Sequence, residues 1–125
     1  MKNVLFENDL GVGYVLDGIL HIRCSKSHQD KVVAEAILSE RLNSVKGIEY
    51  PCIGDFRNLK TMTKEARDVY SSDMGHKGIS AMAILMNPGV GVMIAKFFMK
   101  FNSPKIPTKI FTNEISAKEW VSKFV

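Results

Sequence analysis

The sequence predicts a single α/β domain over residues 1–125, with a mixed sheet of about five to six strands and four helices packed on it. Two patterns support this prediction. The first part of the chain contains short apolar runs separated by turn signals, which is typical of an antiparallel meander. The second part alternates apolar runs with amphipathic segments, which indicates parallel strands joined by right-handed helical crossovers.

The N-terminal meander is predicted from apolar runs at residues 3–6, 13–16 and 19–24. The pair Asp17-Gly18 lies between the last two runs. Such a pair favours a two-residue hairpin turn, because both turn positions need positive φ angles. We therefore expect the last two runs to be adjacent antiparallel strands.

A first helix is expected from His28 to about Val45, because apolar residues recur there at helical spacing. Ser27 is the expected N-cap, with Asp30 three residues later as a variant of the capping box. Gly47 follows the last apolar position and is expected to end the helix.

A buried strand is expected over residues 50–56, followed by a loop and a second helix. Thr63 is the expected N-cap of that helix, and two glycines, at positions 75 and 78, are expected to end it. The inward face of this helix is expected to carry Ala66, Val69, Tyr70 and Met74.

The remaining elements continue the alternation. Residues 79–86 are apolar on both faces, as expected for a central strand. A third helix is expected from residue 87 to about residue 102, and a last strand near residues 108–111. Asn113 is the expected N-cap of a final helix.

The composition narrows the function. The chain has 17 Lys and Arg against 13 Asp and Glu, which gives a net charge of +4 with scattered lysines. Nucleic-acid binders usually cluster basic and aromatic side chains on one face, so we expect no nucleic-acid partner. Cys24 and Cys52 lie in no metal-binding pattern and are interpreted as buried free thiols in a reducing compartment. With no signal peptide and no apolar run of about 20 residues, the expected location is the cytoplasm.

The sequence contains no recognisable set of catalytic residues. His21, His28 and His76 do not share a helical face, and each is interpreted as an ordinary surface or core residue. Gly89 and Gly91 open a helix, but the third glycine and the acidic residue of a dinucleotide site are missing. We therefore expect a protein that is not an enzyme and binds no metal or cofactor.

The expected third helix, with the sequence GVGVMIAKFFMKF, is apolar on nearly every side. Its polar side chains are Lys96 and Lys100, which share one narrow face. Three interpretations stay open: burial in the chain's own core, an interface with a second copy or a partner protein, and a surface for an apolar ligand or membrane. The candidate interface or ligand residues are Val90, Met93, Ile94, Phe97, Phe98 and Phe101.

Four segments together resemble the STAS domains, and most closely their SpoIIAA-like branch: VLDGILHI, YPCIGDFRNLKTMTKEAR, GISAMAILM and PTKIFTNEISAKEWV. The resemblance covers nearly the whole chain and implies a STAS-like fold with a regulatory, non-enzymatic role in protein interaction. In anti-sigma-factor antagonists of this family, an Asp-Ser pair begins the second helix, and a partner kinase phosphorylates the serine. The pair falls on Thr63 and Lys64 here, so lysine replaces the acceptor serine.

The loop after the buried strand is the candidate partner- or ligand-binding loop, formed by Asp55, Arg57, Asn58, Lys60, Thr61, Thr63 and Lys64. A lysine cannot accept phosphate and reverses the charge that phosphate would add. The loop therefore fits an acidic ligand or partner, or it is only a solvated, capped turn that Asp55 shapes. Two further functions stay open: binding of a small apolar or lipid-like ligand through the third helix, and phosphorylation-regulated antagonism through Thr61 or Thr63.

Overall fold

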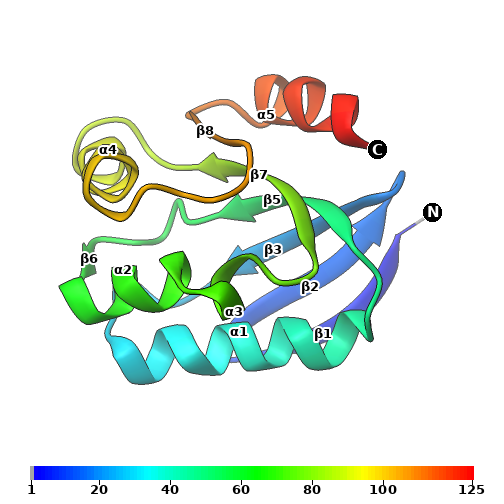
Figure 1. The fold of residues 1–125 in the computed structure, drawn as a ribbon, viewed down its shortest axis with the longest axis horizontal. Helices are drawn as coiled ribbons and strands as arrows, with labels where there is room; N and C mark the ends of the chain where they lie inside the picture. Colours follow the sequence, from blue (N-terminus) through cyan, green and yellow to red (C-terminus); the bar gives the residue numbers. More distant parts are fainter. Residues whose placement is uncertain (1) are drawn as a thin grey trace.

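The computed structural model describes residues 2–125, apart from the side chain of Phe101. A six-stranded mixed sheet forms its centre (Figure 1). In spatial order, its strands are β1 (Asn3–Asn8), β2 (Gly11–Leu16), β3 (Ile19–Cys24), β5 (Tyr50–Asp55), β7 (Ile79–Leu85) and β8 (Thr108–Phe111). The pairs from β1 to β3 are antiparallel and the pairs from β3 to β8 are parallel, which confirms the predicted meander and crossovers.

Within the described residues there are five α-helices, one more than the sequence predicts. They are α1 (Lys31–Val45), α2 (Lys64–Ser71), α3 (Asp73–His76), α4 (Val90–Asn102) and α5 (Glu114–Val121), and a 3-10 turn, Ser122–Phe124, follows α5. Helix α3 is separate because Ser72 is extended, with φ −69° and ψ 169°, and so interrupts the expected second helix. Met74 was expected on the inward face, but it lies in α3 and is exposed, so that prediction is wrong.

Hydrophobic clusters lie on both faces of the sheet. On one face, Ile37 of α1 packs with Leu20 and Cys52. On the other face, Ala117 of α5 packs with Ala83 of β7. Figure 1 shows the result, with α1 and α2 on one side of the strands and α5 on the other.

Several local predictions are confirmed. Asp17 and Gly18 adopt positive φ angles of 55° and 77° in the turn between β2 and β3, as a two-residue hairpin requires. The Asn113 side chain accepts the N–H of Ser116 at 3.0 Å and caps α5. These features depend on residues close together in the sequence.

The predicted start of α1 is wrong by three residues, because Asp30 and not Ser27 is the N-cap. The Asp30 carboxylate accepts the N–H of Val33 at 3.0 Å. Ser27 lies before a short strand that precedes the helix.

That short strand is β4 (His28–Gln29), which pairs in parallel with β6 (Thr61–Met62). The Ser27 carbonyl accepts the N–H of Lys60 at 2.7 Å and that of Thr61 at 3.1 Å. The Thr61 hydroxyl also bonds Nδ1 of His28. These bonds fix the loop between β5 and α2 to the start of α1.

Arg41 is buried in α1, with 4% of its surface exposed. Its guanidinium donates to the carbonyl oxygens of Met74 at 3.1 Å, Gly75 at 3.1 Å and Lys77 at 3.0 Å. A buried charged group is tolerated when hydrogen bonds replace its hydration. Arg41 therefore fixes the segment around α3 against α1.

We expect Arg41→Met to lower the free energy of unfolding by about 3 kcal/mol, because three carbonyl groups lose their donor while most of the apolar volume stays. Urea unfolding followed by circular dichroism measures the change. Lys31→Met, at an exposed position of the same helix, is the control and should change stability by less than about 0.5 kcal/mol. Equal stability of Arg41→Met and wild type would contradict this role of Arg41.

Candidate interaction surface and cavity

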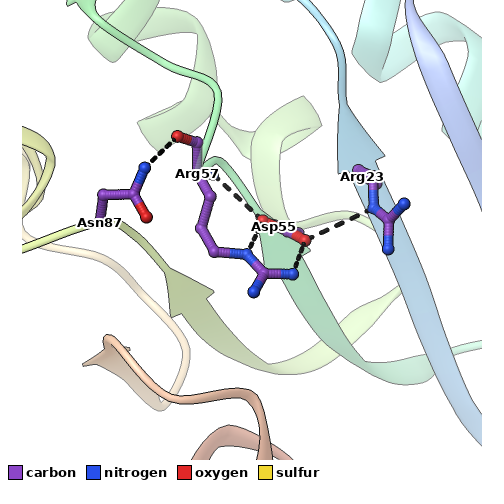
Figure 2. Close-up of polar contacts among 4 residues, drawn as sticks. All are labelled: Arg23, Asp55, Arg57 and Asn87. Atoms are coloured by element: carbon purple, nitrogen blue, oxygen red, sulfur yellow. Dashed lines mark hydrogen bonds and ion pairs between the residues drawn. The ribbon is translucent and has the colours of Figure 1, made fainter.

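Asp55 ends β5, and two arginine side chains hold its carboxylate (Figure 2). Arg57 donates from Nε to Oδ1 at 3.0 Å, from Nη2 to Oδ2 at 2.7 Å, and from its backbone N–H to Oδ1 at 3.1 Å. Nε of Arg23, on β3, lies 3.6 Å from Oδ2. Asn87 Nδ2 donates to the Arg57 carbonyl at 2.7 Å and joins the loop to the end of β7. Asp55 therefore shapes the loop backbone.

The surroundings of Asp55 lower the pKa of its carboxyl group. Burial disfavours the charged form and acts to raise the pKa, but the hydrogen bonds and charge of Arg57, together with the charge of Arg23, outweigh burial. The carboxylate is therefore ionised at neutral pH, and its charge is neutralised within the chain.

The start of α2 is the position where the STAS resemblance places the phosphoacceptor. The Thr63 hydroxyl accepts the N–H of Ala66 at 3.1 Å, which confirms Thr63 as the N-cap. Lys64 Nζ donates to Asp68 Oδ2 at 2.9 Å on the exposed side of the helix. Lys64 therefore pairs with Asp68, whereas the Asp55 carboxylate pairs with arginines.

The middle of the loop lies against α4. Leu59 is buried in one cluster with Met86 and Ala95, whereas its neighbours Asn58 and Lys60 are exposed. The loop therefore turns one apolar side chain inward and presents two polar ones to solvent.

The outer face of α4, as we name it, consists of five exposed residues: Val90, Met93, Lys96, Phe97 and Lys100. Val90 is 62% exposed, Met93 69% and Phe97 48%, and their spacing on one helix face groups them into an exposed apolar patch. The guanidinium carbon of Arg67, on α2, lies 4.7 Å from the centre of the Phe97 ring. Apolar surface on this face is thus bordered by positive charge.

The interpretation that this helix is enclosed in the chain's own core is wrong. Ala95 is buried, and Ile94 and Phe98 are only partly buried. Of the six apolar residues predicted as an interface, three are exposed and two are partly covered, and the Phe101 side chain lies outside the described residues.

A cavity of about 80 Å³ lies under the inner side of α4, and we name it the α4 cavity. Its apolar lining includes Met62, Met82, Met86, Ala95, Phe98 and Ile106. Protein interiors contain few voids larger than a water molecule. This cavity is partly open to solvent, so a small ligand can reach it from the surface.

One end of the α4 cavity is polar. His76 and Lys105 contribute to its lining there, beside Tyr70. Nε2 of His76 is buried and makes no hydrogen bond among the described residues. Lys105 Nζ and His76 Nε2 lie 3.0 Å and 3.7 Å from the same oxygen, Oδ1 of Asp73.

The sequence predicted an apolar ligand site on this helix that includes Phe98, but it did not predict the other walls of the α4 cavity. Its three methionines come from β6, β7 and the residue after β7, and His76 comes from α3, so no local spacing connects them. Within residues 2–125, no cluster of three or more His, Cys, Asp or Glu side chains is placed to hold a metal ion. The described helices are all too short or too polar to cross a membrane.

The sheet order, the helices on both faces and the loop after β5 define a SpoIIAA-like α/β domain. A similar solved structure is the crystal structure of an uncharacterized protein of the DUF3478 family with a SpoIIAA-like fold from Shewanella loihica PV-4. Its TM-score is 0.56 and its identity 15%, and the match covers 97% of this chain and 92% of that one. The expected fold is therefore confirmed.

A family model described as a domain of unknown function, DUF7793, matches residues 14–125. The chain belongs to this family. No curated protein matches it.

The ion pairs of Asp55 with Arg57 and Arg23 predict that the stability of the protein depends on pH. The folded pKa lies below that of an unfolded aspartate, about 3.9, so ionised Asp55 stabilises the fold at neutral pH. That contribution is lost as pH falls through the folded pKa. We expect wild type to be more stable than Asp55→Asn above about pH 5, with a difference that shrinks below about pH 4. Urea unfolding from about pH 7 down to about pH 3 measures this difference, with the exposed Asp9→Asn as the control. A difference that is the same at every pH would contradict the ionised pair.

The Thr63 cap can be tested separately. Thr63→Ala should destabilise the protein by about 1 kcal/mol, because the N–H of Ala66 loses its acceptor. Thr63→Ser keeps the accepting oxygen and should remain within about 0.5 kcal/mol of wild type. Thermal unfolding of wild type and both variants measures these changes in stability. An equal loss of stability in Thr63→Ala and Thr63→Ser would exclude the cap as the cause.

Proposed function

We propose that the protein is a non-enzymatic interaction module of the STAS type whose outer face of α4 binds an acidic, amphipathic helix of a partner protein. The observation that carries the proposal is the exposure of Val90, Met93 and Phe97, spaced three and four residues apart on one helix. Contiguous exposed apolar side chains mark interaction sites, and Met and Phe are enriched in protein interfaces.

The charges around this face favour an acidic partner. Lys96 and Lys100 lie on the outer face, Arg67 lies over the Phe97 ring, and α4 contains no Asp or Glu. Acidic residues beside the apolar positions of a partner helix would make complementary contacts and accelerate association. A second copy of this chain, with its net charge of +4, would bring lysines together, so we favour a different protein over a homodimer.

The loop between β5 and α2 extends the proposed surface. Leu59 packs in one cluster with Ala95 of α4, so the exposed Asn58 and Lys60 lie beside that helix. Lys60 adds positive charge at this border. The partner would therefore contact α4 with its apolar residues and the loop with its acidic ones.

We propose that binding does not need phosphorylation of this loop. The Thr63 hydroxyl is engaged as a helix cap, and the Thr61 hydroxyl bonds His28. A phosphate on either residue would displace a contact that orders the loop, and Lys64 stands where the resemblance places the acceptor serine.

A photoreactive p-benzoylphenylalanine at position 93 tests the surface in cells that express the protein. Ile115 on α5 is the matched control position, because it is 70% exposed and Met93 is 69% exposed. We expect a cross-linked partner from position 93 and none from position 115. Equal cross-linking at both positions would contradict the proposal, and a cross-link to a second copy, with a dimer in light scattering, would establish the homodimer instead.

Binding of the purified partner then tests the chemistry. Calorimetry should show about tenfold or more weaker binding by Phe97→Asp, because the apolar contact is lost. The double variant Lys96→Glu, Lys100→Glu should lose most affinity at low salt and less at high salt, because salt screens charges. If neither the substitutions nor the salt concentration changes the affinity, the outer face of α4 and its charges do not form the binding site.

A further inference from the structure

We infer that the α4 cavity is a binding site for a small carboxylic acid with a short apolar chain. This inference does not depend on the proposed partner, because the cavity lies on the inner side of α4 and the proposed docking face lies on its outer side. The apolar lining would take the chain, and the polar end beside α3 would take the acid group.

The apolar part of the site is open because of small and flexible side chains. Ala95 is 4% exposed and contributes only a methyl group to the wall. Met62, Met82 and Met86 form much of the remainder, and methionine adapts its shape to ligands more readily than branched side chains do. Binding sites for small molecules share this design of apolar walls with a few convergent polar groups.

The size of the cavity limits the chain length. Its volume of about 80 Å³ is roughly half of the 150 Å³ that encloses a benzene molecule in an engineered protein cavity. The site therefore encloses about three or four carbon atoms, and the rest of the ligand would extend toward the polar end.

The two basic side chains at the polar end already contact one carboxylate, that of Asp73, which lies at the surface beside the cavity. One carboxylate oxygen of Asp73 lies 3.0 Å from Lys105 Nζ and 3.7 Å from His76 Nε2. Asp73 is a surface residue whose side chain is 87% exposed, so it can turn away at little cost. A ligand carboxylate in its place would meet the same two nitrogen groups, including the buried His76 Nε2 that makes no hydrogen bond among the described residues.

The alternative head groups fit less well. An amine would meet the Asp73 carboxylate, which Lys105 already neutralises, and would be repelled by Lys105 itself. An alcohol could accept one hydrogen bond but would gain no charge interaction. A carboxylate therefore makes more favourable contacts at this end of the cavity than an amine or an alcohol would.

Methionine-methyl NMR gives a readout at the site itself. The protein is labelled with [methyl-¹³C]methionine and titrated with hexanoate, hexan-1-ol and hexylamine in turn. Hexanoate should bind most tightly and should shift the methyl signals of Met62, Met82 and Met86, which line the cavity. Met93 lies on the outer face and is the internal control. The inference is overturned if none of the cavity methyls shifts, if Met93 shifts as much as they do, or if hexylamine binds more tightly than hexanoate.

Three variants separate the apolar part of the site from the polar end. Ala95→Leu fills the cavity and should remove the shifts caused by hexanoate and by hexan-1-ol. Lys105→Met should lower the affinity for hexanoate about threefold and leave the affinity for hexan-1-ol unchanged. Asp73→Asn should raise the affinity for hexanoate about threefold, because the Asp73 carboxylate no longer competes with the ligand for Lys105 and His76. The last two positions are exposed, so these variants test the inference even if Ala95→Leu does not fold. Equal affinity of hexanoate for wild type, Lys105→Met and Asp73→Asn would overturn the acid preference.

Discussion

Strand β7 has apolar side chains on both faces, and each face must be covered to exclude water. The chain covers the two faces very differently. On the α5 side, the small side chains Ala83 and Ala117 allow close packing, and both are fully buried. On the other side, Met82 and Ile84 lie under α4, where coverage is partial and a cavity remains. The candidate sites are both consequences of this unequal packing, because α4 leaves apolar atoms exposed on its outer side and space on its inner side.

The contacts of the loop after β5 differ from those that the sequence led us to expect. The STAS resemblance marks this loop for regulation, and its residues suggested a basic binding loop. In the structure, the charges and hydroxyls of the loop are largely engaged within the chain: Asp55 with two arginines, Thr63 with the start of α2, and Lys64 with Asp68. What remains for a partner is the exposed apolar side of α4 with Asn58 and Lys60 beside it, so the helix contributes more of the candidate surface than the loop does.

Features that depend on residues close together in the sequence were predicted, whereas features that depend on contacts between distant segments were mostly not. Asp17-Gly18, Thr63 and Asn113 act through neighbouring residues, and each was predicted. The start of α1 was missed because the pairing of β4 with β6 joins segments about 30 residues apart. Arg41 was overlooked, although it lies at helical spacing from Ile37 and Val45 and its charge was a visible exception on that stripe. For most of the α4 cavity no such signal exists, because its walls come from five separate segments of the chain.

The short pairing of β4 with β6 has a consequence for the kinetics of recognition. Backbone bonds from Lys60 and Thr61 to the Ser27 carbonyl tie the loop to the rest of the chain without any partner. A loop that is already ordered loses little conformational entropy on binding. Encounter with a partner would then be limited by diffusion and by charge, and not by the time that a flexible segment needs to fold. Preorganisation of this kind favours rapid association, because no segment has to fold during the encounter.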